Sequence, residues 1–167
     1  MNDTPAPAAD TALTPPNYVR FLGILVLVKL AIVAIFYALT FVGVELKTTS
    51  TFVVAPMVAA MIEGQMYAKA NGVKPAGALC WRFAILSAIL AIFVEVLITA
   101  ALFALIPQVG QAVGSMPIVY MIAGGMLAFY FAAFIISHRF FFPMGARNYL
   151  NAEAAKAKRA ASKAGKS

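Results

Sequence analysis

Three ionisable residues lie inside long apolar stretches of the sequence and are the first candidates for chemistry: Lys29, Glu63 and Glu95. A charged side chain at the centre of a membrane-spanning helix costs about 2.5 to 3.5 kcal/mol on insertion scales, so such residues face protein rather than lipid. Counted from one end of each stretch, Glu63 lies about 6 to 9 Å deep, Lys29 about 12 Å and Glu95 about 18 Å. The lysine therefore lies at a depth between the two acids, within reach of either.

The charge balance of this intramembrane cluster allows two interpretations. One lysine facing two glutamates leaves an excess negative charge, so one carboxyl group would hold a proton, as in a proton relay or a cation site. A Lys–Glu pair can instead simply fix the register of two helices. We favour the structural pair and keep transport as the alternative.

Other reactive side chains are scarce. Cys80 is the only cysteine and His138 the only histidine, which excludes an internal disulfide and argues against a metal or haem site within one chain. We expect Cys80 to be a small buried apolar residue. No Ser-His-Asp set, phosphate-binding glycine loop or paired-histidine motif is present in the sequence. We therefore expect no catalytic residue, no metal and no cofactor, and we do not expect an enzyme.

The composition indicates which solvent surrounds these residues. Of the 167 residues, 63% are apolar and 11% are charged, and the mean hydropathy is +0.89. Soluble domains carry about 25% charged residues. Lipid accounts for the difference, and the net charge of +7 fits membrane topology better than nucleic-acid binding because no nucleic-acid motif accompanies it.

Four apolar stretches are candidates for helices that cross the membrane, since a crossing needs about 20 residues. The second is the weakest, because it contains Pro56 and Glu63; Asn71-Gly72 provides its helix stop. The fourth starts at Pro117 and is expected to end by Pro143 and Gly145. The expected spans are about 21–44, 51–68, 79–105 and 117–140.

The predicted fold class is therefore all-α: an integral membrane four-helix bundle, 18–145, with up-down topology. It is flanked by a disordered N-terminal tail, 1–17, and by a basic, Ala-rich C-terminal tail, 146–167. We expect this second tail either to contact anionic lipid headgroups or to remain a solvated helix.

The basic residues predict the orientation. Eleven Lys and Arg residues flank the ends that carry the two termini, and Lys47 alone flanks the opposite ends. Cytoplasmic loops carry the excess of such residues, so both termini are predicted to be cytoplasmic. Four residues are expected to anchor helix ends at the membrane interface: Trp81, Arg82, His138 and Arg139.

Small residues at four-residue intervals predict close helix packing. On the second helix Ala60 and Gly64 belong to such a stripe, and Gly124 belongs to another on the fourth helix. Small residues let helix backbones approach closely in a membrane, so these stripes predict a tight left-handed bundle.

One hairpin of the sequence resembles a known family. The segment from Ala60 to Tyr67, followed by Lys69, Gly72, Lys74-Pro75 and Trp81-Arg82, is similar to the ABZJ-type family of uncharacterised bacterial four-helix membrane proteins over about residues 18–142. Trp81 stands where an acidic residue is expected. The resemblance implies an inner-membrane location and no activity.

Three functions are consistent with these observations. The first is a structural or accessory subunit that packs against a second copy or a larger membrane complex. The alternative is a small oligomeric transporter or channel with a proton- or cation-coupled site at Glu95, Glu63 and Lys29. A third is an adaptor at the lipid surface that uses the basic tail.

Overall fold

The computed structural model describes residues 13–43, 51–105 and 117–165, and all regular structure in these ranges is α-helical. The helices are α1 (Tyr18–Phe41), α2 (Thr51–Asn71), α3 (Gly77–Leu105) and α5 (Pro117–Ala164). The predicted all-α class is confirmed. The two links that join α1 to α2 and α3 to α5, including Lys47, lie outside the described residues.

The helix ends follow local signals in the sequence. Asn17 caps α1, because its side-chain oxygen accepts a hydrogen bond of 2.9 Å from the backbone N–H of Arg20. At the end of α2, Gly72 has a φ of +68°, a left-handed conformation that suits glycine. The predicted stop at Asn71-Gly72 is confirmed, and the start of α3 at Gly77 lies within two residues of the predicted span.

The last five residues of the predicted N-terminal tail are fixed against α2. Residues 1–12 lie outside the described residues, but residues 13–17 contact α2: the N–H of Thr14 donates to the side-chain oxygen of Asn71 at 2.7 Å. The Asn71 amide donates in return to the Thr14 carbonyl at 3.1 Å. These bonds fix the chain before α1, so a disordered tail that reaches residue 17 is wrong for its last five residues.

Helix α5 is one continuous helix of 48 residues, so the expected end by Pro143 and Gly145 is wrong. Proline removes one backbone N–H and disturbs only the bond to the carbonyl four residues earlier. Gly145 and Ala146 are buried against α2, which holds the helix immediately beyond the proline. The following Ala-rich segment has a high helix propensity and continues the helix to Ala164.

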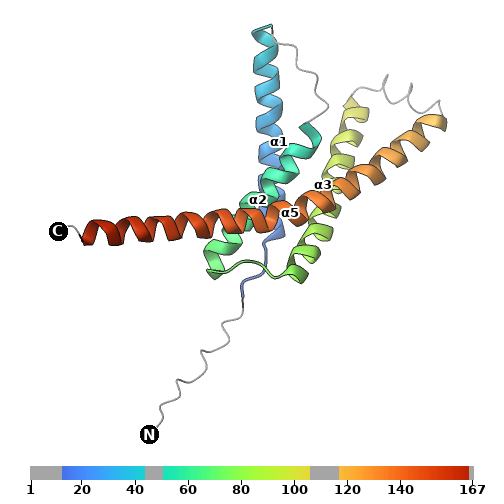
Figure 1. Cartoon of the computed structure of the whole chain (residues 1–167). Helices are drawn as coiled ribbons and strands as arrows, with labels where there is room; N and C mark the ends of the chain where they lie inside the picture. Colours follow the sequence, from blue (N-terminus) through green and yellow to red (C-terminus); the bar gives the residue numbers. More distant parts are fainter. Residues whose placement is uncertain (1–12, 44–50, 106–116, 166–167) are drawn as a thin grey trace.

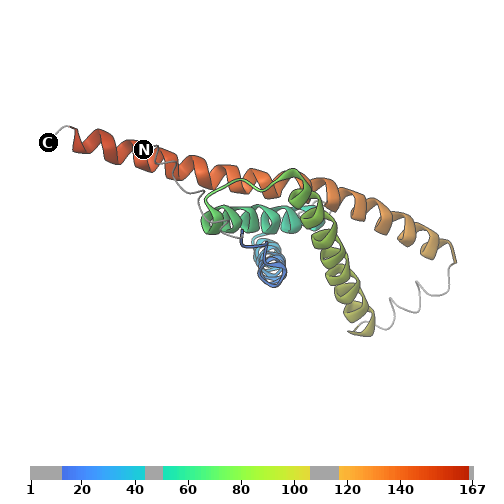
Figure 2. The ribbon, with the colours of Figure 1, turned by 90° about the horizontal axis from the view of Figure 1, so that it is seen from below.

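The four helices meet in one packed centre and diverge from it (Figures 1 and 2). Helix α2 packs between α1 and α5, most extensively against α5, and α3 also packs against α5. The start of α1 lies beside the end of α2, so these two helices run in opposite directions. The arrangement differs from the tight bundle expected from the small-residue stripes, because the close packing is confined to the centre.

Aromatic rings fill this packed centre. Phe83 of α3 stacks on Phe142 of α5 with ring centroids 4.1 Å apart. Phe21 of α1 meets Phe83 edge-on at 5.6 Å, and Tyr67 of α2 lies 5.7 Å from Phe142. All four helices therefore contribute a ring to one cluster, and aromatic pairs of this kind add about 0.5 to 1.5 kcal/mol each beyond area burial.

Two glycines permit the closest approach of helices in the centre. A Cβ atom placed on Gly64 would overlap the carbonyl oxygen of Phe142, and one placed on Gly145 would overlap the carbonyl oxygen of Met61. The backbones of α2 and α5 are thus in direct contact, with Ala60 also fully buried. Ala60 and Gly64, the residues predicted to pack, both lie at this contact between α2 and α5.

Gly124 does not have the packing role predicted for it. A Cβ atom placed there would meet nothing within 4 Å, and residues 121–129 of α5 are all exposed. This part of α5 lies beyond the packed centre, where the helices have already separated (Figure 1). The four-residue stripe around Gly124 therefore contacts no other described helix of the chain.

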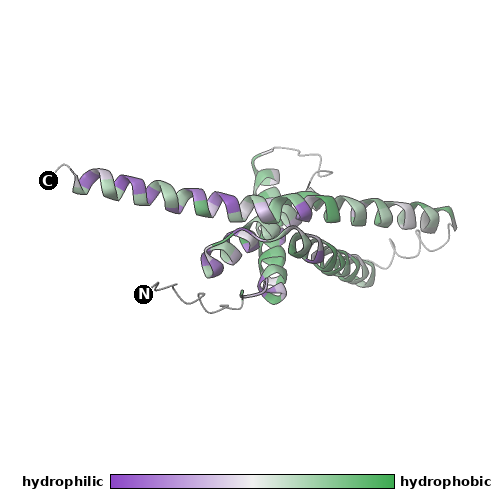
Figure 3. Cartoon of the chain, turned by 60° about the horizontal axis from the view of Figure 1, so that its bottom comes forward, coloured by the Kyte–Doolittle hydropathy of each residue, from purple (hydrophilic) through white to green (hydrophobic). Residues whose placement is uncertain are grey.

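Three helices of the described part are long and apolar enough to cross a membrane: Tyr18–Phe41, Gly77–Leu105 and Met121–Ala164. Helix α2 is not among them, so of the four predicted spans only 51–68 does not correspond to one of these helices. Figure 3 shows hydrophobic residues along α1 and α3 and along the first half of α5, and hydrophilic residues along the C-terminal half of α5. Large apolar side chains such as Leu30, Phe93 and Phe129 are exposed.

Candidate functional site

The first ion pair of the candidate site joins α1 to α3. The Lys29 ammonium contacts Oε1 of Glu95, and both side chains are largely buried, with exposed fractions of 15% and 16%. Both residues lie among apolar neighbours in their helices. The sequence left open which of the two glutamates pairs with Lys29. In the structure the partner is Glu95, the one predicted to lie deeper.

The second ion pair surrounds Glu63 of α2, whose side chain is fully buried. The Arg20 guanidinium donates from Nε to Oε2 at 2.7 Å and from Nη2 to Oε1 at 2.8 Å. The backbone N–H of Asn17 donates to Oε1 at 2.7 Å. This two-point pairing matches the planar fork of arginine to the carboxylate, and it ties the start of α1 to α2.

The predicted cluster of Lys29, Glu63 and Glu95 is therefore divided into two pairs. Each carboxylate has its own cation, so the two pairs carry no excess negative charge. The protonated carboxyl group that the sequence suggested depended on such an excess. The sequence interpretation missed Arg20, which it assigned to topology alone. The available signal was depth, because Arg20 lies in the first turn of α1 and Glu63 close to the same predicted membrane face.

A third polar contact lies between α3 and α5. The Ser87 hydroxyl is 2.7 Å from Nδ1 of His138, and both side chains are fully buried. His138 is thus not an interface anchor, as the sequence suggested, but part of the packed centre. His138 lies on the face of α5 that packs against α3, and nothing in the local sequence distinguishes that face from the exposed ones.

The proton positions in this contact follow from the partners of Ser87. Its hydroxyl lies 2.6 Å from the Phe83 carbonyl oxygen, which can only accept, so the single hydroxyl proton is directed there. The hydroxyl oxygen then accepts from Nδ1–H of His138. In the neutral ring, Nε2 is consequently the nitrogen without a proton, and it has no hydrogen-bond partner within the described ranges.

Aromatic rings enclose this histidine. Phe134 stacks on it at 6.0 Å, Phe21 meets it edge-on at 5.4 Å and Phe83 lies at 6.4 Å. These neighbours offer no hydrogen-bonding group toward Nε2. The surroundings favour a neutral histidine that stabilises packing over one that exchanges protons with solvent.

The other predicted anchors lie at the edge of the packed centre. The Arg139 guanidinium lies 5.3 Å from the centre of the Trp81 ring, a cation–π distance. Trp81 and Arg82 are exposed, as an interface position requires. Their contact with a membrane interface stays a prediction.

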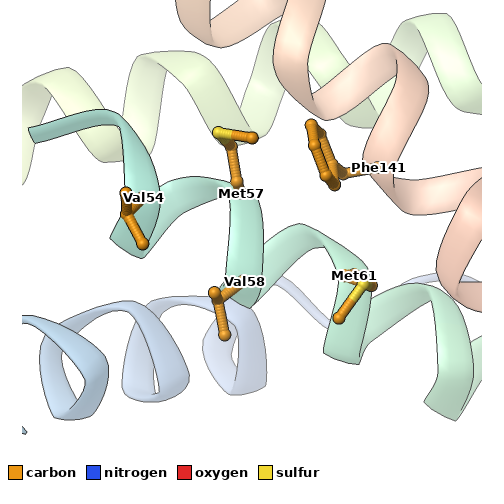
Figure 4. Close-up of a pocket in the computed structure, with 5 residues that line it drawn as sticks. All are labelled: Val54, Met57, Val58, Met61 and Phe141. Atoms are coloured by element: carbon orange, nitrogen blue, oxygen red, sulfur yellow. The ribbon is translucent and has the colours of Figure 1, made fainter. Parts of the chain in front are cut away.

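One small cavity opens between α2 and α5. Its volume is about 120 Å³, and it is lined by four residues of α2 and one of α5, which Figure 4 shows: Val54, Met57, Val58, Met61 and Phe141. Every lining side chain is apolar, so the cavity lacks the acid, base or nucleophile that catalysis needs. It suits hydrocarbon better than a polar substrate.

In the ranges that the structure describes, no three His, Cys, Asp or Glu side chains are placed to hold a metal ion. Comparisons with models of protein families, with curated proteins and with solved structures found no match to this chain. The resemblance to the ABZJ-type family stays a prediction.

Proposed function

We propose that this chain is an integral membrane protein that acts as a structural or accessory subunit by helix packing. The observation that carries the proposal is the exposure of apolar residues along α1, α3 and the first half of α5, outside the packed centre. In water this surface would drive aggregation, whereas in a bilayer it is available to lipid and to other helices. The partner is a second copy or another membrane protein.

The proposed location is the inner membrane of a bacterium, with both termini in the cytoplasm. The start of α1, the end of α2 and the start of α3 lie close together and carry Arg20, Lys69 and Arg82. This grouping of cations supports a shared cytoplasmic side. Helix α2 then crosses as a helix shielded by α1 and α5, which explains how it tolerates a lower hydropathy.

Reporter fusions test this topology. A cytoplasm-active reporter placed after Ser167 should be active, and an export-active reporter placed after Lys47 should be active as well. If α2 does not cross, the two fusions will report the same side. Solubility of the full chain without detergent would contradict the membrane location itself.

Disulfide crosslinking in native membranes tests the packing function. In a Cys80→Ala background, single cysteines are placed at exposed apolar positions by Leu30→Cys, Phe93→Cys and Phe129→Cys. Under oxidation at least one helix should give a discrete crosslinked product. Lys158→Cys, on the exposed tail, serves as the control for random collision. Monomer alone at all three apolar positions would contradict packing against a second copy.

Transport is the second candidate function, and the Lys29–Glu95 pair favours it because both charges lie within apolar helices. Such a pathway needs an oligomer, since four helices enclose little space. Proton or cation flux into liposomes should then fall with Glu95→Gln and persist with Glu153→Gln, which changes an exposed tail residue. Equal flux in both variants would remove this function.

A further inference from the structure

The C-terminal half of α5 is a strongly basic surface that neither packing nor transport uses. Between residues 146 and 164 the helix carries one acidic residue, Glu153, and five basic ones: Arg147, Lys156, Lys158, Arg159 and Lys163. All six are exposed. One short-range pair, Lys156 with Glu153 at 2.8 Å, neutralises a single cation, and its hydrogen bond raises the pKa of Lys156. The remaining cations are available to an anionic partner.

The direction of this segment distinguishes between possible partners. In Figure 1 α1 stands upright and the C-terminal half of α5 runs across it; in Figure 2, where α1 is seen along its axis, the same half of α5 lies side-on. A helix that crosses α1 in this way runs along a membrane that α1 spans, and does not project away from it. Because α5 is continuous from its apolar half, the direction of the basic half follows from the packed centre.

We infer that the C-terminal half of α5, residues 147–163, is a surface that binds anionic lipid headgroups. The inference rests on the proposed membrane location and adds a ligand class to it. The residues of this half include few large apolar side chains, so the contact is electrostatic rather than an insertion into the acyl chains. Salt weakens it, because exposed charges are screened over about 8 to 10 Å at physiological ionic strength.

The test uses the full chain in lipid nanodiscs. A Cys80→Ala, Ala157→Cys protein carries a fluorescent donor on the tail, and the discs carry an acceptor on a fraction of the headgroups. Energy transfer should be higher in discs with phosphatidylglycerol than in discs with phosphatidylcholine alone, and added salt should remove the difference. Equal transfer in the two lipids would overturn the inference.

Charge and helix content are separated by two matched variants. Lys158→Gln, Arg159→Gln and Lys163→Gln together should shift the equilibrium toward the free tail by roughly fivefold for each cation removed. Ala152→Gln, Ala155→Gln and Ala160→Gln change three exposed neutral positions of the same helix and should leave transfer unchanged. Equal losses in both variants would contradict a charge-based contact.

Two further outcomes distinguish a failure of the headgroup contact from a failure of the proposed membrane location. Failure of the chain to enter nanodiscs would refute the membrane proposal, whereas successful entry with transfer that ignores lipid charge refutes the headgroup contact alone. A tail that ignores phosphatidylglycerol but binds soluble polyglutamate would assign the surface to an acidic protein and also overturn the inference.

Discussion

Glu63 and Arg20 form an unequal ion pair, because the glutamate side chain is fully buried whereas the arginine side chain keeps 39% of its surface exposed. Removing the arginine leaves a buried carboxylate without its cation, a loss of about 3 to 5 kcal/mol for buried pairs. Removing the glutamate leaves the Arg20 guanidinium without its partner, but this side chain is partly exposed and can still be solvated. The two halves of one contact should therefore differ in their effect on stability.

We expect Arg20→Gln to lower the free energy of unfolding by about 3 to 5 kcal/mol and Glu63→Gln by about 2 kcal/mol. Thermal unfolding in detergent, followed by the fluorescence of Trp81, measures both. Lys156→Gln breaks an exposed pair and should leave the unfolding temperature unchanged. A larger loss for Glu63→Gln than for Arg20→Gln would refute the assigned burial.

The Ser87–His138 contact allows a test by a double-mutant cycle. Ser87→Ala leaves the buried Nδ1–H of His138 without an acceptor and should cost about 1 to 3 kcal/mol. Adding His138→Phe removes the unpaired group and replaces it with a ring that suits its aromatic neighbours. The double variant should consequently lose less stability than the two single variants together, and strictly additive losses would argue against the contact.

At this scale the sequence predicted which residues are costly in an apolar environment but not how they pair. Lys29, Glu63 and Glu95 are recognisable because charges are rare in such stretches. Their partners depend on how each helix is rotated and on which helices are neighbours. Neither can be read from a single sequence. For this reason the sequence assigns Arg20 to membrane topology and His138 to the interface, because a residue near a helix end fits these roles equally well.

The contact between α2 and α5 depends on the two glycines at their crossing. Gly64→Ala and Gly145→Ala each place a methyl group against a backbone carbonyl that cannot move independently of its helix. We expect each to cost about 1 to 3 kcal/mol or more, measured by thermal unfolding in detergent. This backbone contact is the main junction between the second helix and the rest of the chain.

Gly124→Ala is the matched control for these two substitutions. The position is exposed with open space around it, so the substitution should be neutral or should stabilise α5 by up to about 1 kcal/mol through helix propensity. A loss as large as that of Gly64→Ala would show that this face of α5 packs against another helix, which would then come from a second chain.

Helix positions were the most predictable feature of the chain. The bounds of α2 and α3 agree with the expected spans within a few residues because Asn71-Gly72 and the residues after Pro75 are strong local signals. The end of α5 was not predictable in this way. Pro143 and Gly145 usually end a helix, and here the tertiary contact with α2 outweighs that preference.

The described part of the molecule has one packed centre and long helical segments that lie outside it. Residues 151–164 of α5 are exposed without exception. Deleting residues 151–167 should therefore change the unfolding temperature very little, by the equivalent of less than about 0.5 kcal/mol, while the proposed headgroup contact is lost. A deletion that unfolds the remaining chain in detergent would show that the tail contacts the centre.

The overall arrangement was the least predictable feature. Composition indicated the all-α class, and small-residue stripes indicated close packing, but both features are shared by parallel bundles and by helices that cross at one point. Which of these forms depends on where the large aromatic residues lie along each helix. Here they gather near the basic ends, so the helices converge there and separate elsewhere.

The extensive contact of α2 with α5 has a consequence for synthesis of the chain. The second helix leaves the ribosome long before the last one, and its most extensive contact partner is not yet present. During that interval Glu63 can already pair with Arg20, which precedes it in the chain. The early ion pair therefore retains α2 beside α1 until α5 arrives, and in the proposed membrane location nascent chains that stop before Pro117 should be the ones that membrane proteases remove.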